Sequence, residues 1–330
     1  MATMEPCQSV GQGSQMTRIS DAVELGLQML QERRRVLGQP VGITPRDRNR
    51  IADQLQRAEG PWSEARQNLQ SEPELVAILD ELWPQVIPYL IKGNEVSPVH
   101  HIAYVVNFMT RICLKEVSQI DRKRGVLAAL LHDIGIGDCA LPKISEASIQ
   151  RAAPADKEPL RRRGIESRLE HMKLGVEISR GLLSRHQTEH PGSLTDEDIQ
   201  VILEIVGSHD YSKIPLMEDH VDRKWLLSWE SKDWLKQCHW EADALWMLTP
   251  AGILVDLERE REEDTSENRR AKFLFNLGLH REIITLYSRA YSPEEMQRLG
   301  FHDGLLYRSQ TGYDLARHFE RGMTHVSSER

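Results

Sequence analysis

Apolar residues along most of the chain follow the spacing of amphipathic helices. Between Ile19 and Val36, and again over 72–92, they cluster on what would be one helical face. Further helical stretches are predicted at 46–58, 98–118, 121–134, 165–187, 195–208, 223–257 and 269–322. No stretch shows the sustained alternation of a β-strand, and no hairpin dipeptide joins two apolar runs. The pattern therefore predicts an all-α protein built as a helical bundle.

Breaks in this pattern suggest how the chain is organised. Residues 1–16 are polar and rich in Gly, Ser and Gln, which predicts a flexible tail. Gly60-Pro61 is expected to end the second helix, and Pro84 and Pro88 to bend or split the third. Residues 137–163 are interpreted as a long charged excursion. A length of 330 residues would allow two domains, but the helical pattern favours one bundle with extensions.

Composition and charge exclude several classes of protein. Hydrophobic residues make up 40% of the chain, which permits a sizeable core and excludes a collagen-like or wholly disordered chain. The net charge of -8 argues against sequence-independent nucleic-acid binding, which needs a basic surface. The four cysteines are far apart and form no CxxC, so a disulfide framework is not expected and a zinc ribbon is excluded.

The chain shows neither a signal peptide nor a membrane span. Its first 15 residues contain no basic region followed by an apolar run. The longest apolar stretch near the middle, Val126 to Leu131, is far too short to cross a bilayer. We therefore expect a cytoplasmic protein, or one from a comparable reducing compartment, with no membrane partner. The sequence carries no prediction of oligomeric state.

Histidine and aspartate recur at intervals of 31 to 39 residues, each time in a predicted helical context. The positions are His100-His101, His132-Asp133, His171, His209 and Asp243. Because each comes from a different helix, their side chains can converge inside the bundle, which is how bundles assemble metal sites. An imidazole and a carboxylate turned toward an apolar interior are costly unless a cation compensates. The pattern therefore points to a metal site.

The order His, His-Asp, His, His, Asp resembles that of the HD superfamily of metal-dependent phosphohydrolases. The stretch LLHDIG at 130–135 is its most recognisable piece. The resemblance covers roughly residues 96–258 and implies an HD metal-binding domain there. Residues 17–95 and 259–330 would then be N- and C-terminal helical extensions, of which 273–286 is expected to pack against the central bundle.

The resemblance also implies a set of metal ligands. Those common to the superfamily would be His101, His132, Asp133 and Asp243. His101 is chosen over His100 because the family places this histidine four residues before a Val, here Val105. His171 and His209 would be the additional ligands of members that bind two metals, with Asp133 bridging. Mixed nitrogen and oxygen ligation suits Fe, Mn, Co, Ni or Zn.

The activity implied by the resemblance is metal-dependent hydrolysis of a phosphate ester, with a small anionic substrate such as a nucleotide-like molecule. A mono- or dinuclear centre would activate a water molecule and polarise the phosphoryl oxygens, with Asp133 holding the ions. Lys213, four residues after His209, is the best placed side chain to steady the phosphate. Lys143 and Arg161–Arg163 are weaker candidates, and the arginines are read as a solvated charge run.

Two departures from better-known relatives bear on the substrate. Ile136 stands where members that cleave cyclic dinucleotides carry a Lys, and Tyr104 stands where the family usually has an Arg. One alternative is a dinuclear-iron oxygenase of the same superfamily, which would use the same six ligands and O₂ on a small polar substrate. Another is a non-catalytic HD scaffold, against which the retention of all six ligands argues.

Five of the seven tryptophans fall within 22 residues around Asp243. Trp240 and Trp246 flank that aspartate at three positions on either side. The favoured interpretation is a packed wall around the last ligand, since large aromatic residues dominate protein cores. A sharper alternative is that one or two of them cover a flat substrate group. His239, one turn before Asp243, is interpreted as a packing or surface residue.

Overall fold

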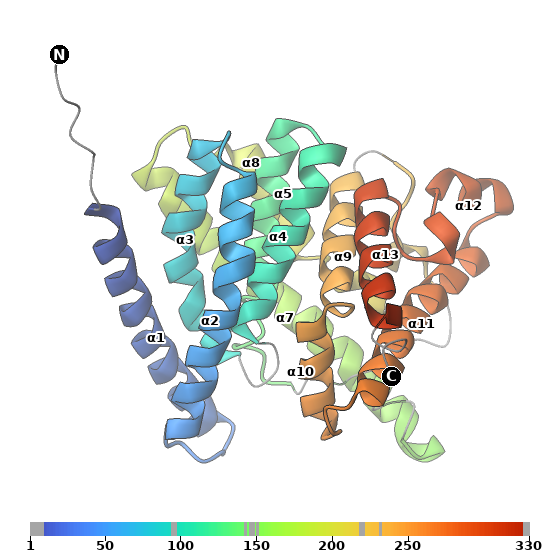
Figure 1. Cartoon of the computed structure of the whole chain (residues 1–330), viewed down its shortest axis with the longest axis horizontal. Coiled ribbons are helices and arrows are strands. Elements are labelled where there is room, and N and C mark those ends of the chain that lie inside the picture. The colour runs from blue at the N-terminus through green and yellow to red at the C-terminus, as the bar shows by residue number, and fades with distance from the viewer. Residues whose placement is uncertain are drawn as a thin grey trace.

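The computed structural model describes residues 10–93, 98–141, 144, 149, 152–217, 222–230 and 233–325, with side chains from 18 to 323 (Figure 1). Over these residues the secondary structure is helical and contains no strand, which confirms the all-α prediction. The α-helices are α1 (Val10–Val36), α2 (Pro45–Asn68), α3 (Pro73–Lys92), α4 (Val99–Glu116), α5 (Gln119–Leu131), α7 (Pro154–Glu189), α8 (Asp196–Val206), α9 (Trp234–Trp246), α10 (Pro250–Glu260), α11 (Ser266–Ala290), α12 (Pro293–Leu299) and α13 (Gln310–His325).

The centre of the bundle is formed by α4 and α5. Helix α4 packs against α2, α5, α9 and α13, and α5 packs against α8 and α9 as well (Figure 1). The run Val126–Leu131 on α5 is completely buried, which explains why it is apolar at every position. Burying one such aliphatic side chain contributes about 1.5–3 kcal/mol. The two helices that begin or end at predicted ligands therefore lie deep in the core.

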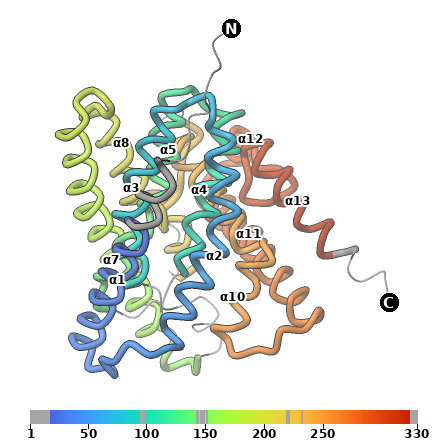
Figure 2. The backbone as a smooth tube through the Cα atoms, turned by 60° about the vertical axis from the view of Figure 1, so that its left-hand side comes forward, coloured from blue at the N-terminus to red at the C-terminus, as the bar shows by residue number. Residues whose placement is uncertain are grey.

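Both extensions join the same core. Helix α1 packs along α3, and α2 packs along α4 (Figure 2). The largest cluster of buried apolar side chains runs from Ala22 on α1 to Ala316 on α13. Phe273 and Leu277 of α11 belong to it, as expected for the stretch 273–286, whereas Ile283 belongs to a second cluster with Trp240. The flanking regions thus pack against the central helices.

Several boundaries differ from the sequence expectations. Helix α2 continues through Gly60-Pro61 to Asn68, because Trp62 is buried and stacks on Trp83 with ring centroids 4.5 Å apart. Helix α3 likewise runs unbroken through two buried prolines. Tertiary packing outweighs the hydrogen bonds that these prolines remove.

The ends of two other helices also differ. Helix α7 begins at Pro154, so the last part of the predicted excursion forms its first turns. Helix α1 begins at Val10, within the predicted tail, because helical hydrogen bonds extend upstream from the amphipathic segment. The remainder of that tail, residues 1–9, lies outside the described residues.

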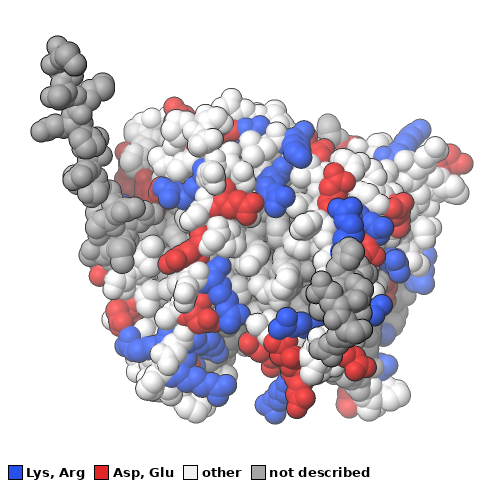
Figure 3. Space-filling view, viewed as in Figure 1, with Lys and Arg blue, Asp and Glu red and all other residues white. Residues whose placement is uncertain are grey.

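One face of the molecule is mixed in charge. On the face drawn in Figure 3, acidic and basic side chains are interspersed over the helices. In the part of the chain that the structure describes, no helix combines the length and the apolar character needed to span a membrane.

Candidate metal centre

All six predicted ligands lie together in the interior of the bundle. His101 lies in the first turn of α4, His132 caps the end of α5 and Asp133 follows it. The other three are His171 on α7, His209 just after α8 and Asp243 on α9. Each of the six residues is at most 7% exposed. Five segments of the chain therefore deliver side chains to one buried position.

The six side chains form two groups of potential ligand atoms. The first group contains His101, His132 and Asp243, and the second contains Asp133, His171 and His209. Within each group the candidate atoms lie within 4.8 Å of one another. We call these the His101 group and the His171 group.

Distances within the His101 group suit a single ion. The Nε2 atoms of His101 and His132 lie 3.1 Å apart, and His101 Nε2 lies 3.2 Å from Asp243 Oδ1. Two ligand atoms about 2.1 Å from one ion, at an angle of about 90° to 110°, lie about 3.0–3.4 Å apart. These atoms are thus placed as ligands of a common ion would be.

The His171 group has the same spacing. The Nε2 atoms of His171 and His209 lie 3.1 Å apart, and His209 Nε2 lies 3.3 Å from Asp133 Oδ1. The other carboxylate oxygen of Asp133 faces the first group, 3.6 Å from His101 Nε2 and 3.7 Å from His132 Nε2. Asp133 therefore has one oxygen directed to each group, which is the arrangement of a bridging carboxylate.

Backbone carbonyls fix the orientation of three of the rings. The Nδ1 atom of His132 contacts Ala129 O at 2.9 Å. The corresponding contacts are 3.0 Å from His171 Nδ1 to Ser167 O and 2.7 Å from His209 Nδ1 to Val206 O. A carbonyl oxygen can only accept, so Nδ1 carries the proton and Nε2 of the neutral ring carries the lone pair. The metal-binding atom of each ring is thus turned toward the centre.

This orientation makes a shared cation favourable. His171 and His209 point two Nε2 lone pairs at each other across 3.1 Å, and the facing atoms repel unless a cation or a proton lies between them. Burial opposes a charge on His209, yet its hydrogen bond to Asp133 and the nearby Asp210 raise the pKa of the ring. That hydrogen bond needs a proton on Nε2, so a protonated His209 takes the place of the cation when no metal is bound. The donor set therefore fits divalent ions that accept mixed nitrogen and oxygen ligands.

Close backbone packing positions the His-Asp pair. Gly135 lies in the turn after His132-Asp133, and a Cβ atom there would lie 2.2 Å from the carbonyl oxygen of His171 and 2.3 Å from the nitrogen of Gly175. Only glycine allows α7 to approach the end of α5 this closely. The glycine of LLHDIG thus brings the bridging carboxylate next to the His171 group.

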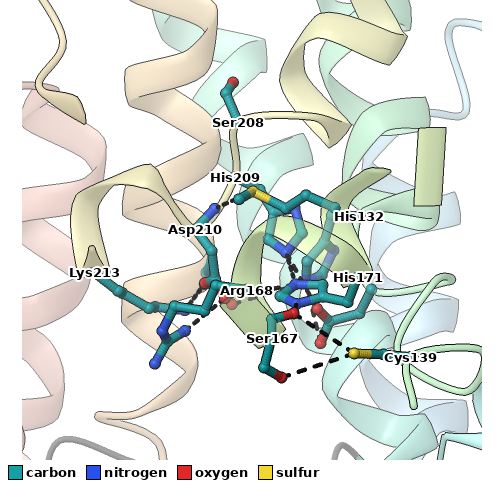
Figure 4. A network of polar contacts seen from close by, with 12 residues as sticks. His132, Cys139, Ser167, Arg168, His171, Ser208, His209, Asp210 and Lys213 are labelled. Carbon is teal, nitrogen blue, oxygen red and sulfur yellow. Dashed lines mark hydrogen bonds and ion pairs between the residues drawn. The ribbon is translucent and has the colours of Figure 1, made fainter. Parts of the chain in front are cut away.

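A network of charged side chains adjoins the ligands (Figure 4). Asp210 accepts from Arg168 Nη1 at 2.6 Å and from Lys213 Nζ at 2.7 Å, and Lys213 Nζ also lies 2.8 Å from Asp243 Oδ2. Although burial acts in the opposite direction, Lys213 and Arg168 hold the pKa of Asp210 well below its usual range. The structure therefore brings the predicted Lys213 to the centre, paired with two carboxylates.

Sequence reasoning missed Arg168 and Asp210. Asp210 directly follows His209, so this second His-Asp pair was a signal that could have identified it. Arg168 carried no such signal, because its contact depends on how α7 packs. His239 is fully buried, with its ring edge-on to His132 at 5.1 Å between centroids, so it packs in the core rather than at the surface.

Two of the five clustered tryptophans, Trp240 and Trp246, pack near the centre, as expected for part of a packed wall around Asp243. The ring of Trp246 lies edge-on to His101, with centroids 5.3 Å apart. Trp240 is buried and donates its indole N–H to Ser208 O at 3.2 Å. Of the weaker phosphate candidates, Arg161 is half-buried and Arg162 and Arg163 are exposed on α7, while Lys143 lies outside the described residues.

Comparison of the chain with protein-family models, with curated proteins and with solved structures found no match.

Proposed function

We propose that this protein is a metal-dependent hydrolase of the HD superfamily that cleaves a phosphate ester at a dinuclear centre. The observation that carries the proposal is Asp133, whose two carboxylate oxygens face two separate groups of buried ligands. The His101 group would hold one ion and the His171 group the other. When bound, two divalent ions supply an activated water nucleophile and polarise the phosphoryl oxygens.

The protein's own residues prepare the site for this reaction. Burial lowers the pKa of His132 to about 4, against the opposing influence of Asp133 and Asp243, so this ring is neutral and ready to bind a metal. The carbonyl contacts of His132, His171 and His209 prevent these rings from rotating away from the centre. The positions of the ligands are thus set by the fold, which lowers the cost of assembling the site.

The position and charge of Lys213 support the proposal that the substrate is anionic. Its ammonium group lies beside Asp243, and its side chain is 23% exposed, whereas the ligands are almost completely buried. Burial disfavours the charged amine, but Asp210 and Asp243 outweigh it and raise its pKa, so the charge is retained at neutral pH. A phosphate group that reaches the ions would meet this cation. Asp210, paired with Arg168, would act as a positioning residue for it.

The test combines metal analysis with activity assays. Purified protein loaded with Mn²⁺, Ni²⁺ or Co²⁺ is screened for phosphate release from phosphate monoesters and nucleotides, with and without O₂. Release that does not depend on O₂ and is lost in Asp133→Ala supports the proposal. Asp314→Ala is the matched control, because Asp314 is exposed on α13. A dinuclear iron optical signal with O₂ consumption and no phosphate release would instead support the oxygenase alternative.

A further inference from the structure

A second cluster of potential metal ligands lies at the far end of α7. It consists of Glu81 on α3 together with His186 and His190, which lie four residues apart where α7 ends. Glu81 Oε1 lies 2.9 Å from His186 Nδ1, and Glu81 Oε2 lies 2.8 Å from His190 Nε2. None of these residues contributes to the groups around Asp133.

The helices hold the two histidines side by side. Residues four positions apart on an α-helix share a face, and the two rings here have centroids 4.7 Å apart and planes inclined by 35°. Glu81 reaches them from the neighbouring helix, so the three side chains meet across the junction between α3 and α7. His186 lies within the last turn of α7, and His190 is the residue that caps the end of that helix.

The cluster is buried on one side and open on the other. The side chain of His186 is 3% exposed, that of Glu81 25% and that of His190 52%. Glu81 and His190 line a groove of about 1430 Å³ that residues of α1 also line. Water or another ligand can therefore reach the cluster from the groove, while α3 and α7 close it from behind.

We propose that Glu81, His186 and His190 bind one Zn²⁺ ion that is separate from the centre around Asp133. Two imidazoles and one carboxylate are a ligand set that zinc uses with a fourth position left for water or a further ligand. One candidate ligand atom from each of the three residues lies within 4.8 Å of the other two, which is close enough for all three to reach one ion. The fourth position would open into the groove, where a ligand with a carboxylate, thiolate or imidazole group could occupy it.

The bound ion would connect the end of α7 to the middle of α3. Without metal, the two histidines share one carboxylate through hydrogen bonds. With metal, the ion replaces those protons and joins all three side chains directly, so binding stabilises the folded protein. Zinc should therefore stabilise the groove side of the molecule independently of the catalytic centre.

The experiment counts zinc in the full-length protein. Metal-stripped wild type and the variants are dialysed against Zn²⁺ in the low micromolar range, and zinc per chain is measured. His190→Ala is expected to hold one equivalent less than wild type. His318→Ala, at an exposed position on α13, is the matched control and should hold as much as wild type. Equal zinc contents in wild type and His190→Ala would overturn the proposal.

A second comparison separates this site from the centre around Asp133. Asp133→Ala removes the ligand that faces both groups at the centre, and the double variant Asp133→Ala/His190→Ala should hold one equivalent of zinc less than Asp133→Ala does. Glu81→Gln, combined with Asp133→Ala, should reduce the zinc-dependent rise in unfolding temperature that Asp133→Ala alone still shows. If zinc leaves Asp133→Ala completely, the second site is refuted, whatever the activity of the wild-type enzyme.

Discussion

The Nε2 atoms of His171 and His209 lie 3.1 Å apart, and each ring donates its Nδ1 proton to a backbone carbonyl. Neither neutral ring has a proton to place between them. The contact therefore indicates a site that the chain has shaped for a cation. It also connects α7 to the end of α8, so loss of the cation should lower the stability of the fold.

Removal of metal should lower the unfolding temperature by about 5–10 °C, because it takes away the cation that two groups of buried ligands share. Calorimetry with and without a chelator measures this, with His190→Ala as the starting protein so that the second site does not contribute. In His171→Gln the effect of the chelator should be less than half as large. An unfolding temperature that the chelator leaves unchanged in metal-loaded protein would contradict the account.

Lys213→Met should lower kcat/KM for the phosphate ester about 10- to 1000-fold while metal remains bound, because it removes the cation beside the ligands. Lys236→Met is the matched control: its side chain is also 23% exposed and it also lies near two carboxylates, those of Glu204 and Asp233. The control should keep its activity. An unchanged kcat/KM in Lys213→Met would refute the assigned role of this lysine.

Gly135→Ala should destabilise the protein by about 2–4 kcal/mol and reduce its metal content, because the added methyl group would overlap the backbone of α7. Urea denaturation and metal analysis measure the two effects. Gly181→Ala, on α7 itself, is the control, since a Cβ atom there meets no atom within 4 Å. That change should be neutral or stabilising by up to about 1 kcal/mol. Equal stability of the two variants would show that the close approach is unimportant.

His280 should make the protein sensitive to acid. Burial against Tyr307 lowers the pKa of this ring to about 4, whereas a histidine in the unfolded chain has a pKa of about 6.5. Below about pH 6.5 the histidine therefore binds a proton in the unfolded state but not in the folded state. The free energy of unfolding falls as the pH drops toward 4. Between pH 7 and pH 5 this histidine alone should cost about 2 kcal/mol.

Urea denaturation of wild type and His280→Leu at pH 7 and pH 5 tests this contribution. The loss of stability between the two pH values should be about 2 kcal/mol smaller in the variant. His318→Leu, at an exposed position, should behave as wild type does. The same pH dependence in all three proteins would exclude the proposed role of His280.

Periodicity predicted the helical class because the buried faces are long and apolar. It failed at Gly60-Pro61, where the local signal for a break was outweighed by the packing of Trp62 on Trp83, a contact between distant parts of the chain. Local sequence carries no information on such contacts. Helix boundaries that depend on them could not be predicted.

The candidate ligands could be proposed from sequence because each stands in a recognisable context, such as His132-Asp133 after a fully apolar run. The division of these ligands into two groups could not be predicted from sequence. It depends on which oxygen of Asp133 faces His101 and which faces His209, and this follows from the crossing of α4, α5 and α7. Arg168 and the cluster around Glu81 were missed for the same reason, since their partners lie on other helices.

The most direct test is the position of metal in crystals of the protein grown with Mn²⁺, measured by anomalous diffraction. Two peaks about 3.5–4 Å apart, one on each side of the Asp133 carboxylate, are predicted. One peak should be bound by the His101 group and the other by the His171 group. Crystals of the Mn²⁺-saturated protein with no anomalous peak at Asp133 would contradict the account.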